Sequence, residues 1–233
     1  MPEPDPVSVA FLIYPGVTQL DFTGPAQVLS RLGNVTVDFV ARRPGPVPTD
    51  AGFSVLPTAT FGDLAAADIL CVPGGLACVD VIEDDEILAW VRGAGERSAW
   101  VTSVCTGSLI LGAAGLLRGY RAACHWAWRE HLRRFGAEPV AERVVFDRNR
   151  VTGGGVTAGI DFALALTAAI RGEDHARLVQ LALEYDPAPP FDCGSPERAG
   201  EALLGAYRRR MEKLAPGHER RIGAAAARHG FGA

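Results

Sequence analysis

The chain has 233 residues, of which 48% are hydrophobic, and its formal net charge is −4. This length and hydrophobicity suit one α/β domain with a large core, and the charge does not favour nucleic acid as a partner. The five cysteines form no CxxC pair, which argues against a disulfide framework and a zinc site and fits a reducing cytoplasm. We find neither a signal peptide nor an apolar run near the roughly 18–20 residues that span a bilayer. We therefore expect a soluble, cytoplasmic protein.

The first half of the chain alternates strands with helices. The continuous apolar run at 7–14 is typical of a central strand covered on both faces, and Pro15-Gly16 ends it. The segments predicted after it are a helix from about Phe22 or Pro25 to Arg31, strands at 35–42, 53–57 and 68–72, a helix at 84–97, a strand at 99–104 and a helix at 106–117.

The second half repeats this alternation. Its predicted elements are a helix at 126–135, a hairpin of 144–146 and 150–152 around the turn Asp147-Arg148-Asn149, and helices at 161–170, 176–183 and 197–214. The pattern predicts a flavodoxin-like α/β fold, in which helices sandwich a mostly parallel sheet. We expect a single domain over 1–233, with a short proline-rich lead and a mobile, basic tail from about residue 215.

The strongest functional signal is Cys105, which stands between a β-prone run and a helix-like run. A side chain on such a strand-Cys-helix turn, here called the nucleophile elbow, is held rigidly and points away from the sheet. The N–H groups at the start of the new helix stabilise negative charge, so we expect this thiol to ionise near neutral pH. A cysteine can also be a small buried hydrophobic residue, but the elbow favours a nucleophile.

Three strand exits carry the other candidate residues: the segment that leads to Asp21, Pro73-Gly74-Gly75, and Cys105-Thr106-Gly107. Ligand sites in open α/β sheets lie beyond the carboxyl ends of the strands, so we expect these segments to meet. The N–H groups of Gly75 and Thr106 are candidates for an anion hole beside the sulfur. The run Gly153-Gly154-Gly155 lacks the Lys-Ser/Thr of a phosphate-binding loop, and we interpret Gly154 as part of the pocket wall.

Asp21 is the acid that we pair with Cys105. It precedes a predicted helix, so it is also a good candidate for the N-cap of that helix. If Asp21 faces a thiolate in a dry pocket, repulsion and desolvation raise its pKa and let it keep a proton for donation. The sequence alone leaves cap and catalyst equally open.

Two more residues compete for a role. His125 precedes Trp126 and is either a base for Cys105 or a half-buried residue that anchors a turn. Cys78 follows the glycine turn and is the rival nucleophile, although no helix start is evident beside it.

These segments together resemble the PfpI-type superfamily, whose fold is related to the class I glutamine amidotransferases. Within it, the chain is similar to the branch whose members hydrate isocyanides. The matching segments are YPGVTQLDFTGP at 14–25, VPGG at 72–75, SVCTGS at 103–108, LLRG at 116–119, HW at 125–126 and VTGGGVTAGID at 151–161. The elbow and Pro-Gly-Gly are general to the superfamily, whereas aspartate instead of glutamate at position 21 and the Thr-Gly-Gly-Gly block point to this branch.

The resemblance implies the cofactor-free hydration of an isocyanide to an N-substituted formamide. In this chemistry a cysteine thiolate adds to the terminal carbon to give a thioimidate, and water then displaces the thiol. The resemblance makes Cys105 the nucleophile, Asp21 the general acid, and Thr106 a hydrogen-bond donor near the sulfur or the aspartate. From the cysteine spacing, the net charge and the lack of a long apolar run we expect no metal ligands and no nucleic-acid or membrane partner. The resemblance suggests a homodimer with the pocket near the subunit interface.

Two alternatives stay open at this point. Another cysteine-dependent hydrolase or glyoxalase of the superfamily would rely on His125 instead of Asp21. A non-enzymatic sensor would react once at Cys105 without turnover, because the elbow, the His-Trp pair and the glycine block also occur in the sensor halves of AraC-type regulators.

Overall fold

A computed structural model of the chain describes residues 4–231. Residues 1–3 of the proline-rich lead and residues 232–233 of the tail therefore lie outside the described residues. The core of the structure is a seven-stranded sheet in the order β10-β11-β7-β6-β1-β2-β5. These strands are β1 (Val7–Leu12), β2 (Val35–Ala41), β5 (Ala59–Thr60), β6 (Ile69–Val72), β7 (Trp100–Val104), β10 (Val144–Asp147) and β11 (Arg150–Gly153). Every pair is parallel except β10–β11, which confirms the predicted mostly parallel sheet.

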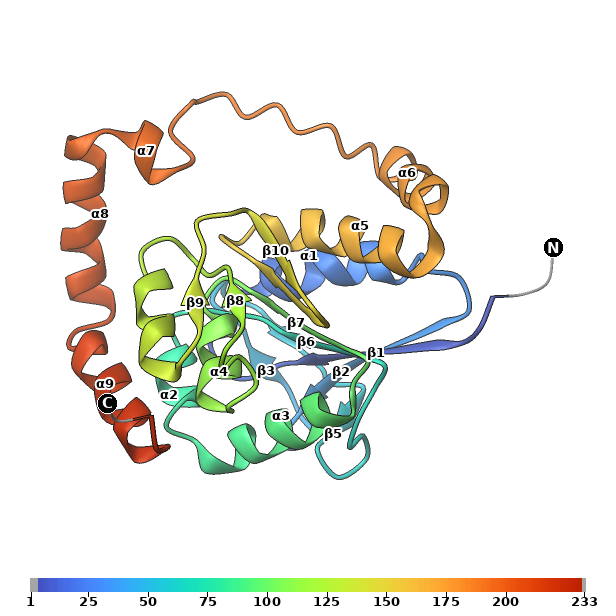
Figure 1. Cartoon of the computed structure of the whole chain (residues 1–233), viewed down its shortest axis with the longest axis horizontal. Helices are drawn as coiled ribbons and strands as arrows, with labels where there is room; N and C mark the ends of the chain where they lie inside the picture. Colours follow the sequence, from blue (N-terminus) through green and yellow to red (C-terminus); the bar gives the residue numbers. More distant parts are fainter. Residues whose placement is uncertain (1–3, 232–233) are drawn as a thin grey trace.

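Helices cover both faces of this sheet, with α1 and α5 on one side and α3 and α4 on the other (Figure 1). The helices are α1 (Gln19–Leu29), α2 (Cys78–Val81), α3 (Asp85–Arg97), α4 (Gly107–Ala113), the 3₁₀ helix η1 (Arg129–Phe135), α5 (Ala158–Arg171), α6 (Glu173–Ala182), α7 (Pro196–Ala199), α8 (Glu201–Leu214) and α9 (His218–Arg228). Within residues 4–231, no helix has the length and apolarity needed to cross a membrane.

Two small sheets accompany the main one. They pair β3 (Val47–Pro48) with β4 (Ser54–Val55), and β8 (Arg121–Ala122) with β9 (Glu138–Pro139). Strands this short carry little periodicity, and only the one at 53–57 was predicted. The predicted helix at 126–135 is also shorter than expected, since only 129–135 is helical and it is a 3₁₀ helix.

The start of α1 differs from the prediction for a physical reason. The helix begins at Gln19, earlier than Phe22 or Pro25, and its N-cap Thr18 makes no side-chain capping bond of its own. The cap is supplied by Asp50, whose carboxylate accepts a hydrogen bond from the Gln19 N–H at 3.1 Å and another from the Thr18 hydroxyl at 2.7 Å. A donor at the start of a helix can be satisfied by a distant residue, and a local pattern does not reveal this.

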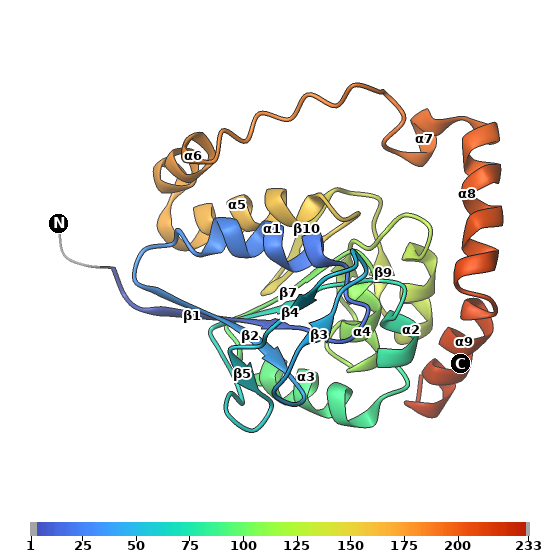
Figure 2. The same cartoon turned by 180° about the vertical axis from the view of Figure 1, so that it is seen from behind.

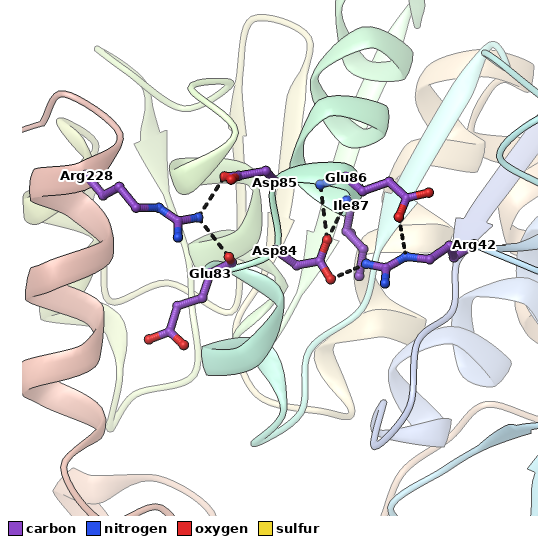
Figure 3. A network of polar contacts seen from close by, with 7 residues as sticks. All are labelled: Arg42, Glu83, Asp84, Asp85, Glu86, Ile87 and Arg228. Carbon is purple, nitrogen blue, oxygen red and sulfur yellow. Dashed lines mark hydrogen bonds and ion pairs between the residues drawn. The ribbon is translucent and has the colours of Figure 1, made fainter.

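The helix α3 begins as its sequence predicts. Asp84 is the N-cap, and its Oδ1 accepts hydrogen bonds from the N–H groups of Glu86 and Ile87 at 3.1 Å each. Arg42, just after β2, forms ion pairs with Asp84 and Glu86 (Figure 3). The ion pairs therefore join the end of β2 to the start of α3.

The end of the chain is helical where the sequence predicted a mobile tail from about residue 215. Ile222, Ala225 and Ala226 of α9 are buried, and their spacing of three and four residues places them on one helix face. Arg228 at the end of α9 donates to the Asp85 carboxylate at 2.7 Å (Figure 3). The basic composition concealed this short apolar stripe, so the sequence did not predict the helix α9.

The strand order also fixes where a site can form. From β1 the chain moves to β2 on one side and later to β6 on the other, so the order reverses between β1 and β6. Ligands in such folds bind beyond the carboxyl ends of the strands at this reversal. The exits of β1, β6 and β7 meet there, as predicted.

Candidate active site

Cys105 occupies a strained turn between β7 and α4. Its φ is +58°, a left-handed value that is rare for a residue with a side chain and is typical of a nucleophile elbow. The Cys105 N–H donates to the carbonyl oxygens of Gly154 at 2.8 Å and Gly153 at 3.2 Å. At the other side of the turn, a Cβ on Gly107 would collide with the Val72 carbonyl oxygen. The main chain around the cysteine is therefore fixed from both neighbouring strands.

Asp21 lies beside this turn, although the two residues are far apart in the sequence. It is the third residue of α1 and is only 1% exposed. Its Oδ2 accepts a hydrogen bond from the Gly74 N–H at 2.8 Å, and its carboxyl group also interacts with the Cys105 thiol. Asp50 therefore supplies the helix cap for which Asp21 was also a candidate, and the Asp21 carboxyl group faces the cysteine.

The surroundings of Asp21 favour its protonated form. Burial raises the pKa of its carboxyl group from 3.8 to about 7, the Gly74 N–H opposes the rise, the charge of Asp50 adds to it, and the Cys105 thiol lowers it slightly. The second carboxyl oxygen, Oδ1, is buried and has no hydrogen-bond partner of regular geometry among residues 4–231. This oxygen is therefore the one available to carry or transfer a proton.

The expectation of a thiolate near neutral pH needs correction. Burial raises the pKa of the Cys105 thiol well above its ordinary value, the charge of Asp21 raises it further, and the Thr106 N–H lowers it. The side chain is only 6% exposed, and the backbone dipoles at the start of α4 do not offset the loss of water. The raised pKa favours the thiol form of Cys105 over the thiolate.

The predicted anion hole is only partly present. The Gly75 N–H donates to the Thr106 hydroxyl at 2.9 Å, and that hydroxyl lies 2.9 Å from the Gly75 carbonyl oxygen, to which it donates. The hydroxyl is therefore engaged away from the Cys105 sulfur, and the backbone N–H of Thr106 is the group that faces it. The N–H of Gly154 is also occupied, because it donates to the Arg143 carbonyl oxygen. Gly75 and Gly154 brace the site and offer no free donor.

His125 does not have the properties of a base for the cysteine. Burial lowers its pKa to about 4, and its Nδ1 accepts a hydrogen bond from the Ala127 N–H at 3.3 Å. Within the described part of the chain, no hydrogen bond joins its ring to Cys105. The geometry favours the interpretation of His125 as a half-buried residue that anchors a turn.

The other cysteines are poor nucleophiles or lie elsewhere. Cys78 is fully buried at the start of the short helix α2, a start that the sequence did not reveal, and burial raises its pKa to about 12. Cys71 and Cys124 are buried, and Cys193 is exposed on the segment between α6 and α7. Cys105 is thus the cysteine with an acid partner.

Tyr207 on α8 is a site residue that the sequence did not reveal. Its ring lies 6.1 Å from the His125 ring at an interplanar angle of 19°, and 4.8 Å from the Trp126 ring, measured between centroids. Burial and the charge of Cys105 both raise the pKa of Tyr207, which places its hydroxyl within electrostatic reach of the sulfur. About 100 residues separate Tyr207 from the elbow, so no local motif links them.

The chain is similar to known proteins in both sequence and fold. The model of the DJ-1/PfpI family matches residues 7–169 of the chain. An isonitrile hydratase of Pseudomonas putida is 50% identical over 204 residues, which cover 88% of this chain and 90% of that protein. The crystal structure of a ThiJ/PfpI family protein from Pseudomonas syringae is 43% identical, with a TM-score of 0.87, and covers 95% of this chain and 91% of that one.

A regulator is also among the relatives. The HTH-type transcriptional regulator CdhR of Pseudomonas aeruginosa is 28% identical over 171 residues, which cover 70% of this chain but only 50% of the regulator. This similarity is weaker than the similarity to the hydratase.

The raised pKa of Asp21 predicts how stability depends on pH. A carboxyl group whose folded-state pKa exceeds its unfolded value of about 3.9 contributes stability below that value, and the contribution is lost as the pH rises through about 7. Asp21→Asn removes this titration and leaves an acceptor for the Gly74 N–H. The variant should therefore gain stability over the wild type as the pH rises from 4 to 8, by at most about 4 kcal/mol at roughly 1.4 kcal/mol per pH unit.

Urea unfolding at pH 4.5, 6 and 8 measures this difference. Asp174→Asn is the matched control, because its side chain is fully exposed, and it should show no such trend. A constant difference between Asp21→Asn and the wild type at all three pH values would contradict the raised pKa.

Proposed function

Because the chain belongs to the DJ-1/PfpI family, we propose that it hydrates isocyanides to N-substituted formamides, with Cys105 as nucleophile and Asp21 as proton carrier. The observation that carries the proposal is the pairing of the elbow cysteine with a buried carboxyl group whose pKa is about 7. The similarity to the Pseudomonas putida isonitrile hydratase supports the same reaction here.

The substrate's electronic structure explains why an acid must stand beside the thiol. The terminal carbon of an isocyanide receives both the sulfur and a hydrogen, so the addition occurs at one atom. The proton donor must therefore lie on the same side as the nucleophile. The carboxyl group of Asp21, which interacts directly with the Cys105 thiol, meets this requirement.

In the first step, one proton moves through the pair. With the thiol protonated and Asp21 ionised, the carboxylate accepts the thiol proton as the S–C bond forms and delivers it to the same carbon. The product is a thioimidate, in which the former isocyanide carbon carries one hydrogen, the Cys105 sulfur and a double bond to nitrogen. A carboxyl group with a pKa near the working pH suits both halves of this transfer.

In the second step, water adds to the thioimidate carbon. Asp21, again ionised, accepts one proton from the water as the water oxygen bonds to the carbon, and passes this proton to the nitrogen. The C–S bond then breaks as Asp21 accepts the remaining hydroxyl proton and delivers it to the sulfur, and the N-substituted formamide leaves. Each cycle consumes one isocyanide and one water and restores the thiol, so no redox partner takes part.

The occupied backbone donors are consistent with this route. Acyl transfer requires free N–H groups for a developing oxyanion, whereas in the first step here charge develops on a carbon that Asp21 protonates. The N–H groups of Gly74 and Gly75 are already bound to Asp21 and Thr106. They hold the acid and the elbow in place.

We propose that the rings of His125, Trp126 and Tyr207 form the wall for the substrate's side group. Their stacking creates one aromatic surface, and Tyr207 lies within electrostatic reach of the sulfur. An apolar isocyanide substituent can pack against such a surface at no desolvation cost to charged groups.

We also propose that the chain forms a homodimer in a reducing cytoplasm. Large apolar side chains are exposed on α6, on the segment that leads to α7, and on α8. These side chains are Leu178 and Leu181 on α6, Phe191 before α7, and Leu203 and Leu214 on α8. Figure 2 shows this segment passing from α6 to α7 along the outside of the molecule. A second copy would shield these side chains, and all five cysteines are free thiols, as a reducing compartment maintains.

Turnover of an isocyanide tests the proposed reaction. The purified chain should convert an alkyl or aryl isocyanide to the formamide. The formyl proton of the product, which appears in NMR spectra, measures the conversion. Cys105→Ala should reduce the rate to the uncatalysed level, and Asp21→Asn should reduce kcat by about 10²–10⁴-fold, the usual contribution of a positioned acid or base. Cys193→Ser, which removes an exposed thiol, should retain full activity.

Other outcomes of this assay would support the alternatives. Activity that survives Asp21→Asn but disappears in His125→Ala would indicate another cysteine-dependent enzyme. Stoichiometric modification of Cys105 without formamide release would indicate a sensor.

The pH profile tests the role of Asp21 separately. Below pH 7 both Cys105 and Asp21 are protonated, so the site lacks a base. We therefore expect kcat/KM to rise with pH through about 7, and at pH 6 to be about tenfold below its plateau. Asp50→Asn should move this rise to lower pH, because the charge of Asp50 contributes to the raised pKa of Asp21. A profile that stays flat from pH 5.5 to 8 would exclude Asp21 as the proton carrier.

Variants of Tyr207 test the aromatic wall. Loss of the ring in Tyr207→Ala should raise KM for an aryl isocyanide about three- to tenfold, as expected for an aromatic contact worth about 0.5–1.5 kcal/mol. KM for methyl isocyanide should change little, and Tyr207→Phe should behave like the wild type. Equal effects on both substrates would place Tyr207 outside the substrate wall.

A further inference from the structure

Outside the active site, three side chains have the arrangement of metal ligands. His131 belongs to η1, and His218 and Glu219 are the first two residues of α9. One ligand atom from each lies within 4.8 Å of the other two. Within residues 4–231, no other group of three His, Cys, Asp or Glu side chains meets this spacing. The expectation that the chain has no metal ligands rested on cysteine spacing, which says nothing of histidines that only the fold brings together.

The ring of His218 is oriented as a metal-bound histidine would be. Its Nδ1 lies 2.8 Å from the Ala215 carbonyl oxygen. A carbonyl oxygen can only accept, so Nδ1 carries the proton and the lone pair of the neutral ring is on Nε2. Histidine ligands in metal sites commonly donate their second N–H to a carbonyl in this way, which fixes both tautomer and direction.

Trp128 holds the two imidazole rings in place. Its ring centroid lies 4.5 Å from that of His218 and 6.3 Å from that of His131, and Trp128 itself is only 3% exposed. In the described part of the chain, the ring nitrogens of His131 form no hydrogen bond with protein atoms. The lone pair of the His131 ring is therefore available to a metal ion, and the neighbouring Trp128 ring fixes the position of the imidazole.

The charges around the cluster restrict which cation would bind. Glu219 supplies one negative charge, while Arg134 places a positive charge close to His131. Arg221 is neutralised by its pairs with Asp80 and Glu83. Electrostatic attraction alone is therefore weak, which disfavours Mg²⁺ and Ca²⁺ and favours a metal that bonds strongly to imidazole nitrogen.

From this geometry we propose that His131, His218 and Glu219 bind Zn²⁺ and that the ion fastens α9 to the body of the protein. Two histidines and one carboxylate are a known zinc ligand set, with the fourth position left to water. Ligand atoms around a tetrahedral zinc lie about 3.3 Å apart at bond lengths near 2.0–2.1 Å. The exposed Glu219 side chain can close the remaining gap and leaves a path for the ion to enter.

The ion would reinforce contacts that already hold α9. This helix packs against η1 and α2, and Arg228 anchors its far end to Asp85. The zinc site would fix the opposite end, where α9 follows directly on α8 and its Tyr207. Zinc binding would therefore stabilise the position of α9 without taking part in the chemistry at Cys105.

Zinc titration of the full-length, untagged chain after EDTA treatment tests the site. All proteins carry Cys193→Ser so that the exposed thiol cannot bind the ion. Calorimetry should give one zinc per chain, and His131→Asn and His218→Asn should each weaken the affinity at least tenfold. His175→Asn is the matched control, because its ring is bound to the Arg31 carbonyl oxygen, and it should leave the affinity unchanged. Equal affinities for His131→Asn and the control, or no uptake at 1 mM zinc, would overturn the proposal.

Hydrogen exchange provides a readout that does not depend on the folding of any variant. In the protein that retains His131 and His218, saturation with zinc should slow amide exchange in residues 218–228. EDTA should reverse the effect. Unchanged exchange in this segment at saturating zinc would contradict the attachment of α9. Neither measurement involves an isocyanide, so the result is independent of the proposed hydration.

Discussion

The site depends on the burial of one thiol and one carboxyl group side by side. Both groups lose water, so burial raises the pKa of Asp21 to about 7 and that of Cys105 well above its ordinary value. Two neighbouring acids in a dry site cannot readily both be ionised, because the charges repel and neither is solvated. As the pH rises through about 7, Asp21 loses its proton first and Cys105 keeps its own. Most of the surrounding backbone geometry serves to hold this pair: the φ of +58° at Cys105 and the hydrogen bond from the Gly74 N–H to Asp21.

The glycines around the pair show how close the strand exits must approach. A Cβ on Gly74 would lie 2.5 Å from the Thr106 nitrogen, so any larger residue would push the β6 exit away from the elbow. Gly75 has a φ of +141°, which residues with a side chain rarely adopt. The Pro-Gly-Gly sequence is therefore required by backbone contact between two exits. The same contact occupies the Gly75 N–H, one of the two groups that the sequence suggested for an anion hole.

Local sequence patterns predicted the features that depend on neighbouring residues. The alternation of strands and helices, the β10–β11 hairpin and the elbow at Cys105 follow from short segments. The features that were missed depend on distant residues: Asp50 caps α1 from another loop, and α8 brings Tyr207 to His125. The ionisation of the cysteine was misjudged for the same reason. The helix start is visible in the sequence, but the degree of burial is not, and burial has the larger effect on the pKa.

The same geometry distinguishes between the reactions that this family of folds can support. A Cys–His hydrolase needs a histidine that is basic near neutral pH and free backbone donors for an oxyanion. Here His125 has a pKa of about 4, and the Gly75 N–H already donates to Thr106. Addition to an isocyanide carbon needs neither group, because a single carboxyl group accepts the thiol proton and returns it to the same carbon. A sensor requires only a reactive thiol, and it gives no reason to maintain a buried carboxyl group that costs the fold stability as the pH rises from about 4 to about 7.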